Sequence, residues 1–363
     1  MTRPASMTLK AQRRPSAWPR LGAGPGTAGV VLALALVSAL SVSVQVGAVP
    51  VSARDWSALF DSTEAMSGAA HVLWQLRLPR ALLAMLVGAA LGLAGALSQG
   101  LFRNPMADPG LLGVTSGAAC AAALVLTVFA SVHWPVPVAW RVWLLPAAAF
   151  VGAIVVCYAL DRIARWLTPG SVAGLLLTGL ALNAVAMALV GLCTYLATDE
   201  QLRSLSFWTL GSLAGAQWAV VAILAAVLAL SAWQARRLGQ SLNALALGEA
   251  AAAHVGVDVR RLRARLIAIV ALLSAVSVAW CGVIGFIGLM APHLVRGAAG
   301  ADQKRVLPLA MAAGALLLLI ADTVARTVAI PAEIPVGIFT SLIGGPFFLA
   351  LLRGVARQQG GHA

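Results

Sequence analysis

Long apolar stretches that hold almost no charged side chains follow one another along the whole sequence. An α-helix needs about 20 such residues to cross the hydrocarbon core of a bilayer, so stretches of this length predict membrane-spanning helices. About ten of them can be recognised by this pattern, at residues 28–49, 78–100, 110–130, 142–161, 172–196, 210–235, 262–281, 283–296, 306–326 and 335–353. The predicted fold class is therefore an all-α polytopic membrane protein.

Two of these stretches are irregular. Residues 283–296 are too few to cross a bilayer upright, and the stretch 110–130 begins at a Pro-Gly turn. Short or interrupted spans are tolerated only where protein or a cavity surrounds them. We therefore expect both segments to lie inside the bundle.

The composition supports a membrane class and excludes others. The chain is 61% hydrophobic and only 10% charged, whereas about a quarter of the residues of a soluble domain are charged. Its net charge of +13 does not predict nucleic-acid binding, because the cations lie at the ends of apolar stretches, where the positive-inside bias places them. Lys10 and Lys304 are followed by Ala11 and Arg305, so the chain has no Gly-Lys-Ser/Thr phosphate loop and no P-loop ATPase domain of its own.

The distribution of cations also predicts an orientation. With the N-terminus inside, only six of the 25 Lys and Arg residues fall outside: Arg54, Arg77, Arg80, Arg141, Arg203 and Arg326. Cytoplasmic loops carry an excess of Lys and Arg, so we expect both termini and the loop 236–261 to be cytoplasmic. The predicted organisation is a disordered basic tail over 1–27, a single membrane domain over 28–356, and a cytoplasmic tail over 357–363.

Neither a metal site nor a catalytic centre is predicted. The four cysteines lie in apolar segments without metal-ligand spacing, which is typical of small buried side chains. The five histidines do not pair at ligand spacing. The predicted role is therefore not enzymatic.

The stretch "ALGEAAAAHVG" at 246–256 predicts a short helix that water can surround. It is rich in alanine, with Gly248 and Gly256 near its ends, and offers a smooth apolar face that a groove on another protein can receive. An ordinary solvated loop helix is the alternative.

The spacing of Glu249, Ala250, Ala251 and Gly256 resembles the "EAA…G" loop by which permeases of ABC importers bind their ATPase subunits. The resemblance extends over about residues 70–355 and is carried by "RLPR" (77–80), "AGALSQGLFRNPMADPGLLGVTSGA" (94–118), "LNALALGEAAAAHVGV" (242–257), "GVIGFIGLMAPHLVR" (282–296), "ADTVAR" (321–326) and "EIPVGIFTSLIGGPFF" (333–348). These motifs are similar to those of the FecCD family, the permeases for cobalamin, ferric siderophores and heme.

This resemblance implies a type II ABC importer permease fold with cytoplasmic coupling helices at about 240–257. It assigns ATPase coupling to Leu245, Gly248, Glu249, Ala250, Ala251, His254 and Gly256. The implied partners are a second copy of this chain, two ATPase subunits that hold ATP and Mg, and a periplasmic binding protein. The implied location is the bacterial inner membrane, and the chain itself is expected to bind no cofactor.

Three predicted outer arginines are the second implied site. In the family, arginines at the positions of Arg77, Arg80 and Arg326 receive carboxylates of the binding protein, and Arg-carboxylate pairing is directional. Snorkelling at the membrane interface is the alternative. Asp322 lies four residues before Arg326, and this spacing predicts a local partner for that arginine more than a proton carrier.

Two turns are the third implied site. The resemblance places a constriction of the pathway at Asn104, Pro105 and Met106, although helix capping by Asn104 and Asp108 explains the same residues. A second constriction falls at Val172 and Ala173, where the family's polar pair is absent. Asn183 either lines the pathway or bonds to a neighbouring helix.

The segment "DEQLRSLSFWTLGSLAGA" at 199–216 resembles hemin-importing permeases, which implies heme as the transported substrate and a periplasmic heme-binding protein as the donor. Ferric siderophores and cobalamin are the alternatives within the family. A different class, an ion-coupled secondary transporter, would need acids deep in the bundle, where the predicted spans offer almost only Asp322.

Overall fold

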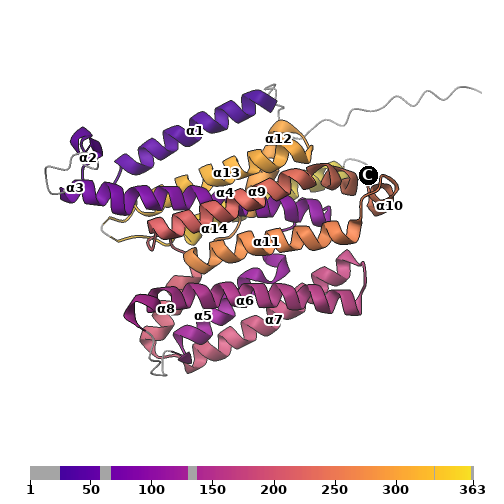
Figure 1. The fold of residues 1–363 in the computed structure, drawn as a ribbon, viewed down its shortest axis with the longest axis horizontal. Helices are drawn as coiled ribbons and strands as arrows, with labels where there is room; N and C mark the ends of the chain where they lie inside the picture. Colours follow the sequence, from indigo (N-terminus) through magenta and orange to yellow (C-terminus); the bar gives the residue numbers. More distant parts are fainter. Residues whose placement is uncertain (1–24, 58–66, 130–136, 331, 361–363) are drawn as a thin grey trace, which may run out of the picture.

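The computed structural model describes residues 25–57, 67–129, 137–330 and 332–360. Figure 1 shows an elongated bundle in which the long helices run side by side. In the described chain, seven helices are long and apolar enough to cross a membrane. They are α1 (Pro25–Gln45), α4 (Leu78–Phe102), α6 (Val138–Leu167), α7 (Val172–Leu196), α9 (Trp218–Ala246), α11 (Val259–Cys281) and α13 (Gln303–Ala325).

Three further helices, α5 (Val114–Leu126), α12 (Ile287–Ala299) and α14 (Val336–Gly360), complete the set predicted from the sequence. Each predicted apolar stretch corresponds to one of these helices, which confirms the all-α fold class. The short connecting elements are α2 (Ala53–Ser57), α3 (Gly68–His71), the π-helix η1 (Val72–Arg77), the 3-10 helix η2 (Pro109–Leu112), α8 (Asp199–Thr209) and α10 (Glu249–His254).

Helix α4 is the centre of the bundle. It packs against α9, α11, α12 and α13, and nearly all of its residues from Val87 onward are buried. Helices α5, α6 and α7 form a second layer that joins the first through α11. Helix α1 lies on the outside, against α13, and most of its surface is exposed.

The packing around α4 depends on glycine. A Cβ built on Gly88 would lie 2.2 Å from the carbonyl oxygen of Gly314 in α13, and one on Gly95 would lie 1.9 Å from that of Gly288 in α12. Both distances are far below van der Waals contact, so the backbones themselves touch. Small residues permit this approach in lipid, where no hydrophobic force draws helices together.

The structure differs from the sequence prediction mainly where helices end. Helix α9 continues to Ala246 rather than stopping at 235, so the first part of the predicted loop 236–261 is helical. The expected outer loop after α7 contains α8, which begins with a reciprocal capping box between Thr198 and Gln201. Its polar sequence carried no apolar signal, and the cap is what starts the helix.

The predicted tails also differ in part. Helix α1 begins at Pro25, inside the predicted tail 1–27, whereas residues 1–24 lie outside the described residues. Helix α14 continues to Gly360, past the predicted boundary at 356, and residues 361–363 lie outside the described chain.

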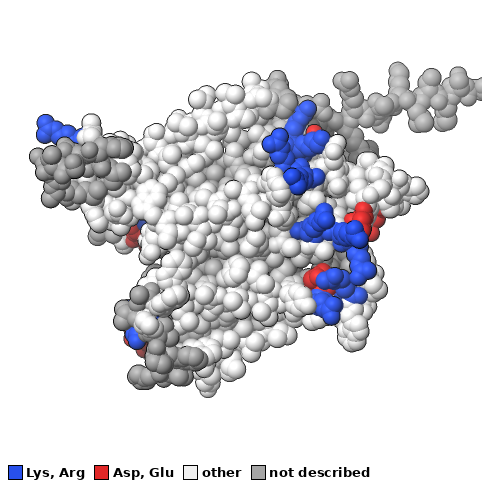
Figure 2. Space-filling model, in the orientation of Figure 1, with Lys and Arg blue, Asp and Glu red and all other residues white. Residues whose placement is uncertain are grey.

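The two ends of the bundle differ in charge. We call the end with α10, the last residue of α4 and the first residue of α7 the α10 end, and the end with α2, α3 and α8 the α8 end. Figure 2 shows most of the visible Lys and Arg gathered at the α10 end, a wide band free of charge beside them, and few cations at the α8 end. This is the asymmetry that the sequence predicted.

Substitution of Gly95 tests the close approach of α4 and α12. Gly95→Ala places a methyl group against a backbone carbonyl that cannot rotate away, and we expect a loss of stability of roughly 3 kcal/mol, the upper end for an overpacked core. The thermal midpoint of the detergent-solubilised protein measures it. Gly297→Ala is the matched control, because a Cβ at that exposed helical position meets nothing within 4 Å. Equal midpoints for the two variants would contradict the close contact.

Candidate functional site

Helix α10 protrudes at its end of the bundle and is bounded by two glycines. Gly248 has φ 118° and Gly256 has φ 84°, backbone conformations that residues with a side chain rarely adopt. Leu245 and Ala252 are buried and fix α10 to the bundle. Of the predicted coupling residues, Gly248 and Glu249 are half-buried, and the exposed ones are Ala250, Ala251, His254 and Gly256.

The tip around α10 presents an apolar surface. Leu247 is 81% exposed and Val255 is 70% exposed, and exposed alanines lie between them. No sequence motif marks Leu247 or Val255, because a single apolar residue in a loop is not a signal by itself. An exposed apolar tip of this kind is a candidate interaction site.

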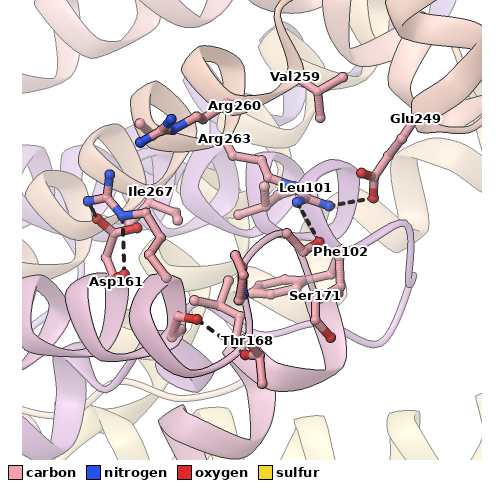
Figure 3. A pocket seen from close by; sticks show the side chains of 17 residues that line it. Leu101, Phe102, Asp161, Thr168, Ser171, Glu249, Val259, Arg260, Arg263 and Ile267 are labelled. Carbon is pink, nitrogen blue, oxygen red and sulfur yellow. Dashed lines mark hydrogen bonds and ion pairs between the residues drawn. The ribbon is translucent and has the colours of Figure 1, made fainter.

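Glu249, at the start of α10, is held by two arginines from other segments. Arg263 on α11 donates from Nη2 to Oε1 of Glu249 and from Nη1 to the carbonyl oxygen of Gly170, at 2.9 Å. Arg103, the residue that ends α4, places Nη2 3.7 Å from the same Oε1. Figure 3 shows Glu249 and Arg263 pointing toward each other from α10 and α11. Arg263 lies in no sequence motif, and only the structure shows its contact with Glu249.

A cavity of about 440 Å³ opens beneath this contact. It lies between the last turns of α4 and α6 and the first turns of α7 and α11, and Val172 is part of its wall. In Figure 3 Thr168 and Ser171 lie on its lower side and Glu249 on its upper side. Gly170 also lines the cavity. One of the two predicted constriction segments therefore lies next to the base of α10.

The other predicted constriction is a tight turn. Arg103 adopts a left-handed φ of 50° and ends α4. Asn104 then accepts a hydrogen bond at Oδ1 from the backbone N–H of Met106, at 2.9 Å. Asp108 accepts one from Gly110 at 2.7 Å, so both polar side chains serve the turn itself. Asn104 and Pro105 are exposed and Met106 is half-buried, and a gating role for them stays a prediction.

Asn183 faces a neighbouring helix. Its Oδ1 accepts a hydrogen bond from the hydroxyl of Ser116 on α5. This geometry favours the second of the two sequence interpretations, a bond between helices. At the start of α7, Ser171 caps the helix by accepting from Gly174 at 3.0 Å, while Val172 is half-buried and Ala173 is exposed.

A hydrogen-bonded joint fixes the extension of α9 that leads to α10. Asn243 on α9 donates to Oδ1 of Asp302, at 2.8 Å, and accepts from the backbone N–H of Gln303. The Asn243 side chain and the N–H of Lys304 hold the pKa of Asp302 below its ordinary value. The carboxylate is therefore ionised across the neutral pH range, and it caps α13 while it anchors α9.

Two of the predicted outer arginines bind the C-terminal end of α1. Arg77 is buried and donates to the carbonyl oxygens of Val44, at 3.2 Å, and Gln45, at 3.0 Å. Arg326 donates to the carbonyl oxygens of Val46, at 3.0 Å, and Ser43. The last carbonyl groups of a helix have no partner within it, and these guanidinium groups supply one.

The third arginine lies in a network of acidic groups. Arg80 donates from Nε and Nη2 to the buried Asp322, at 2.9–3.1 Å, and from Nη1 to Glu333, at 2.7 Å. Arg326 approaches Asp322 only to 4.0 Å. Arg326, the local partner predicted for Asp322, therefore binds this carboxylate more weakly than Arg80 does. Because α4 and α13 pack backbone to backbone, Arg80 comes closer than the residue one turn away.

The buried ion pair gives a stability prediction. Asp322→Asn keeps the shape of the side chain but leaves Arg80 with only the exposed Glu333 as counter-ion. Breaking one partner of a buried pair costs about 3 kcal/mol or more, so we expect a clear fall in the thermal midpoint.

Arg305→Gln is the control for this prediction. It removes an exposed pair with Asp302, whose atoms are 3.8 Å apart, and such pairs contribute less than about 1 kcal/mol. A midpoint for Asp322→Asn as high as that of the control would show that Asp322 does not stabilise the fold.

These features define a class: a multi-pass membrane protein with close-packed helices and an apolar tip at its cation-rich end. The chain belongs to the FecCD transport family, which matches residues 33–354. It is therefore the permease subunit of an ABC importer, and the implied ATP hydrolysis belongs to a separate subunit of such transporters.

Relatives of two substrate types are similar over most of the chain. The hemin transport system permease protein HmuU of Yersinia pestis is 42% identical, over 92% of this chain and 97% of its own. The vitamin B12 import system permease protein BtuC of Serratia proteamaculans (strain 568) is 39% identical, over 89% of this chain and 91% of its own. A metal-chelate type ABC transporter solved in an inward-facing conformation superposes with a TM-score of 0.76 at 33% identity, covering 89% of this chain and 98% of that one.

Proposed function

We propose that this chain is the permease for heme (hemin) and works as a homodimer in the bacterial inner membrane. The observation that carries the substrate assignment is the 42% identity to a hemin permease over 92% of the chain. The segment 199–216, which resembles hemin permeases, supports it. In the structure this segment forms α8 and the turn after it, at the α8 end. Heme is the transported substrate and is not a cofactor of the chain.

The α10 end faces the cytoplasm in this proposal, and so do both termini. The support is the gathering of Lys and Arg at that end, which the positive-inside bias places on the cytoplasmic side. Arg237 stacks over the ring of Trp233, 3.8 Å from its centroid, a contact suited to the membrane interface. The periplasmic heme-binding protein then meets the α8 end.

Helix α10 docks into a groove of the ATPase subunit in this proposal, one ATPase for each copy of the chain. The exposed Leu247 and Val255 supply apolar anchors of the kind that dominate such interfaces. ATP and Mg are bound by the ATPase pair. When that pair closes, it moves α10 and re-packs α4, α5, α6, α7 and α14, so that the outer opening and the inner constriction alternate.

Arg77, Arg80 and Arg326 are proposed to orient the binding protein. Of the three, Arg80 is best placed to receive a carboxylate, because its partner Glu333 is 48% exposed and can be exchanged. Arg77 and Arg326 act mainly by holding the C-terminal end of α1 beside Arg80. The turn at Asn104, Pro105 and Met106 and the start of α7 at Val172 and Ala173 are proposed as the inner constriction.

Cobalamin is the second candidate substrate, because a vitamin B12 permease is nearly as similar as the hemin permease. An ion-coupled mechanism has less support. It needs an acid that exchanges its proton in the bundle. Asp322, which is buried in α13, is bound by Arg80 through three contacts of 2.9–3.1 Å.

Uptake by the reconstituted importer tests the substrate. The chain, its ATPase and its binding protein in proteoliposomes should accumulate heme upon ATP addition at least roughly tenfold faster than cobalamin or a ferric siderophore, a ratio that differences in pocket contacts readily produce. The same vesicles without ATP are the control. Preference for cobalamin would overturn the heme assignment, and uptake driven by an ion gradient without ATP would overturn the importer mechanism.

An acidic residue introduced into the apolar tip around α10 tests whether this helix docks into the ATPase subunit. Leu247→Asp and Val255→Asp should each weaken ATPase binding by roughly thirtyfold, since loss of an interface anchor costs about 2 kcal/mol. Co-purification of the ATPase in a dilution series measures it. Leu202→Asp is the control. Leu202 is also a partly exposed leucine, but it lies on α8 at the opposite end, so this variant should bind the ATPase as strongly as the parent chain does. Parent-like binding by both tip variants would remove α10 from the interface.

A further inference from the structure

The side chains of Glu249 and Arg263 connect α10 to the segment that begins α7. We propose that Arg263 is a positioning residue through which displacement of α10 reaches the turn between α6 and α7, and that Glu249 is the group on α10 that moves it. This inference rests on the proposed function, in which the ATPase displaces α10. It assigns a role to a residue that no sequence motif marked.

The geometry of Arg263 suits a rigid connection. One guanidinium binds two groups on different segments, with Nη1 on the Gly170 carbonyl at 2.9 Å and Nη2 on the Glu249 carboxylate. The guanidinium is planar, so its two outer nitrogens keep a fixed separation. Only 18% of the Arg263 side chain is exposed, which limits competition from water. A shift of Glu249 therefore moves both ends of the connection together.

The carbonyl that Arg263 binds belongs to the turn that starts α7. Gly170 has φ 81°, and the next residue, Ser171, is the N-cap of α7. Val172 and Ala173 follow directly, and they are the residues proposed as one constriction. Displacement of the Gly170 carbonyl therefore changes the position of the cap on which the first turn of α7 depends.

The same carboxylate also faces the other constriction. Nη2 of Arg103 lies 3.7 Å from Oε1 of Glu249, and Arg103 directly precedes Asn104. Both side chains are about 40% exposed, so this contact is the weaker of the two. Glu249 thus lies between the two predicted constriction segments, with a strong connection to one and a weak connection to the other.

The surroundings leave room for movement. The cavity of about 440 Å³ lies under Glu249 and Arg263 and is bounded by the α6–α7 turn. The backbone of α10 packs against α9 and α11, and its connection to the α6–α7 turn passes through the Glu249 side chain. A polar connection across a cavity can transmit a displacement without a tightly packed core being rearranged.

The test uses the full importer in proteoliposomes with whichever of heme, cobalamin or ferric siderophore the parent complex transports. Arg263→Leu should keep ATPase binding and ATP hydrolysis but lower the substrate moved per ATP by roughly five- to tenfold, within the usual range of coupling between sites. Arg263→Lys, which has one ammonium in place of a planar fork, should retain only part of the coupling. Arg261→Leu is the matched control, because Arg261 pairs with Asp258 and is largely exposed.

A double-mutant cycle separates this connection from a general effect on stability. Glu249→Gln and Arg263→Leu interrupt the same connection, so the double variant should lose no more coupling than either single variant. Thermal midpoints measured in parallel should remain close to that of Arg261→Leu. Additive losses, or a fall in ATP hydrolysis that follows the midpoint, would overturn the proposal.

A different failure identifies a different role. Loss of ATPase co-purification in Glu249→Gln, with normal coupling in Arg263→Leu, would overturn the connection and place Glu249 in the ATPase interface. The proposed function would then stand without the inference. A parent complex that neither binds an ATPase nor transports substrate would overturn the proposed function itself.

Discussion

The direct contact of α4 with α12 and α13, backbone against backbone, is the constraint on which the rest of the structure depends. The carbonyl groups of one helix touch the Cα atoms of the next because four glycines carry no side chain: Gly88, Gly95, Gly288 and Gly314. In lipid this close approach gains van der Waals contact that larger residues would prevent. It also fixes what lies at either end of α4: Arg80 against Asp322 at one end, and Arg103 near Glu249 at the other.

The two ends of the bundle use charge differently. At the α8 end Arg77, Arg80 and Arg326 are enclosed, and they satisfy a buried carboxylate and the free carbonyls of a helix end. At the α10 end the ionic contacts are more exposed and join segments that end near a cavity. Enclosed pairs hold one arrangement, whereas a more exposed contact, such as that of Arg103 with Glu249, can be exchanged. This difference fits a subunit whose α8 end moves as one body while contacts at the α10 end rearrange.

The sequence predicted the helices well and the contacts between them poorly. Apolar stretches of membrane-spanning length identify each long helix, because burial in lipid demands them. The extension of α9 and the presence of α8 escaped this pattern, because both are polar and depend on capping and on contacts such as Asn243 with Asp302. Motif resemblance found α10 and the three arginines, but the closest partner of Asp322, Arg80, is 242 residues away. The closest partner of Glu249, Arg263, lies on the next helix, 14 residues away and beyond helical spacing. No local spacing encodes such pairs.

The position of α1 has a consequence for how the chain could be shortened. Its wide exposed face makes it look like an accessory that sits on the surface of the bundle. Yet its final carbonyl groups are the acceptors for Arg77 and Arg326. A chain trimmed of its first helix would lose the carbonyl groups of Ser43, Val44 and Gln45 that accept hydrogen bonds from these two arginines. The deletion would begin at the α10 end, where α1 starts, but it would destabilise the α8 end of the subunit.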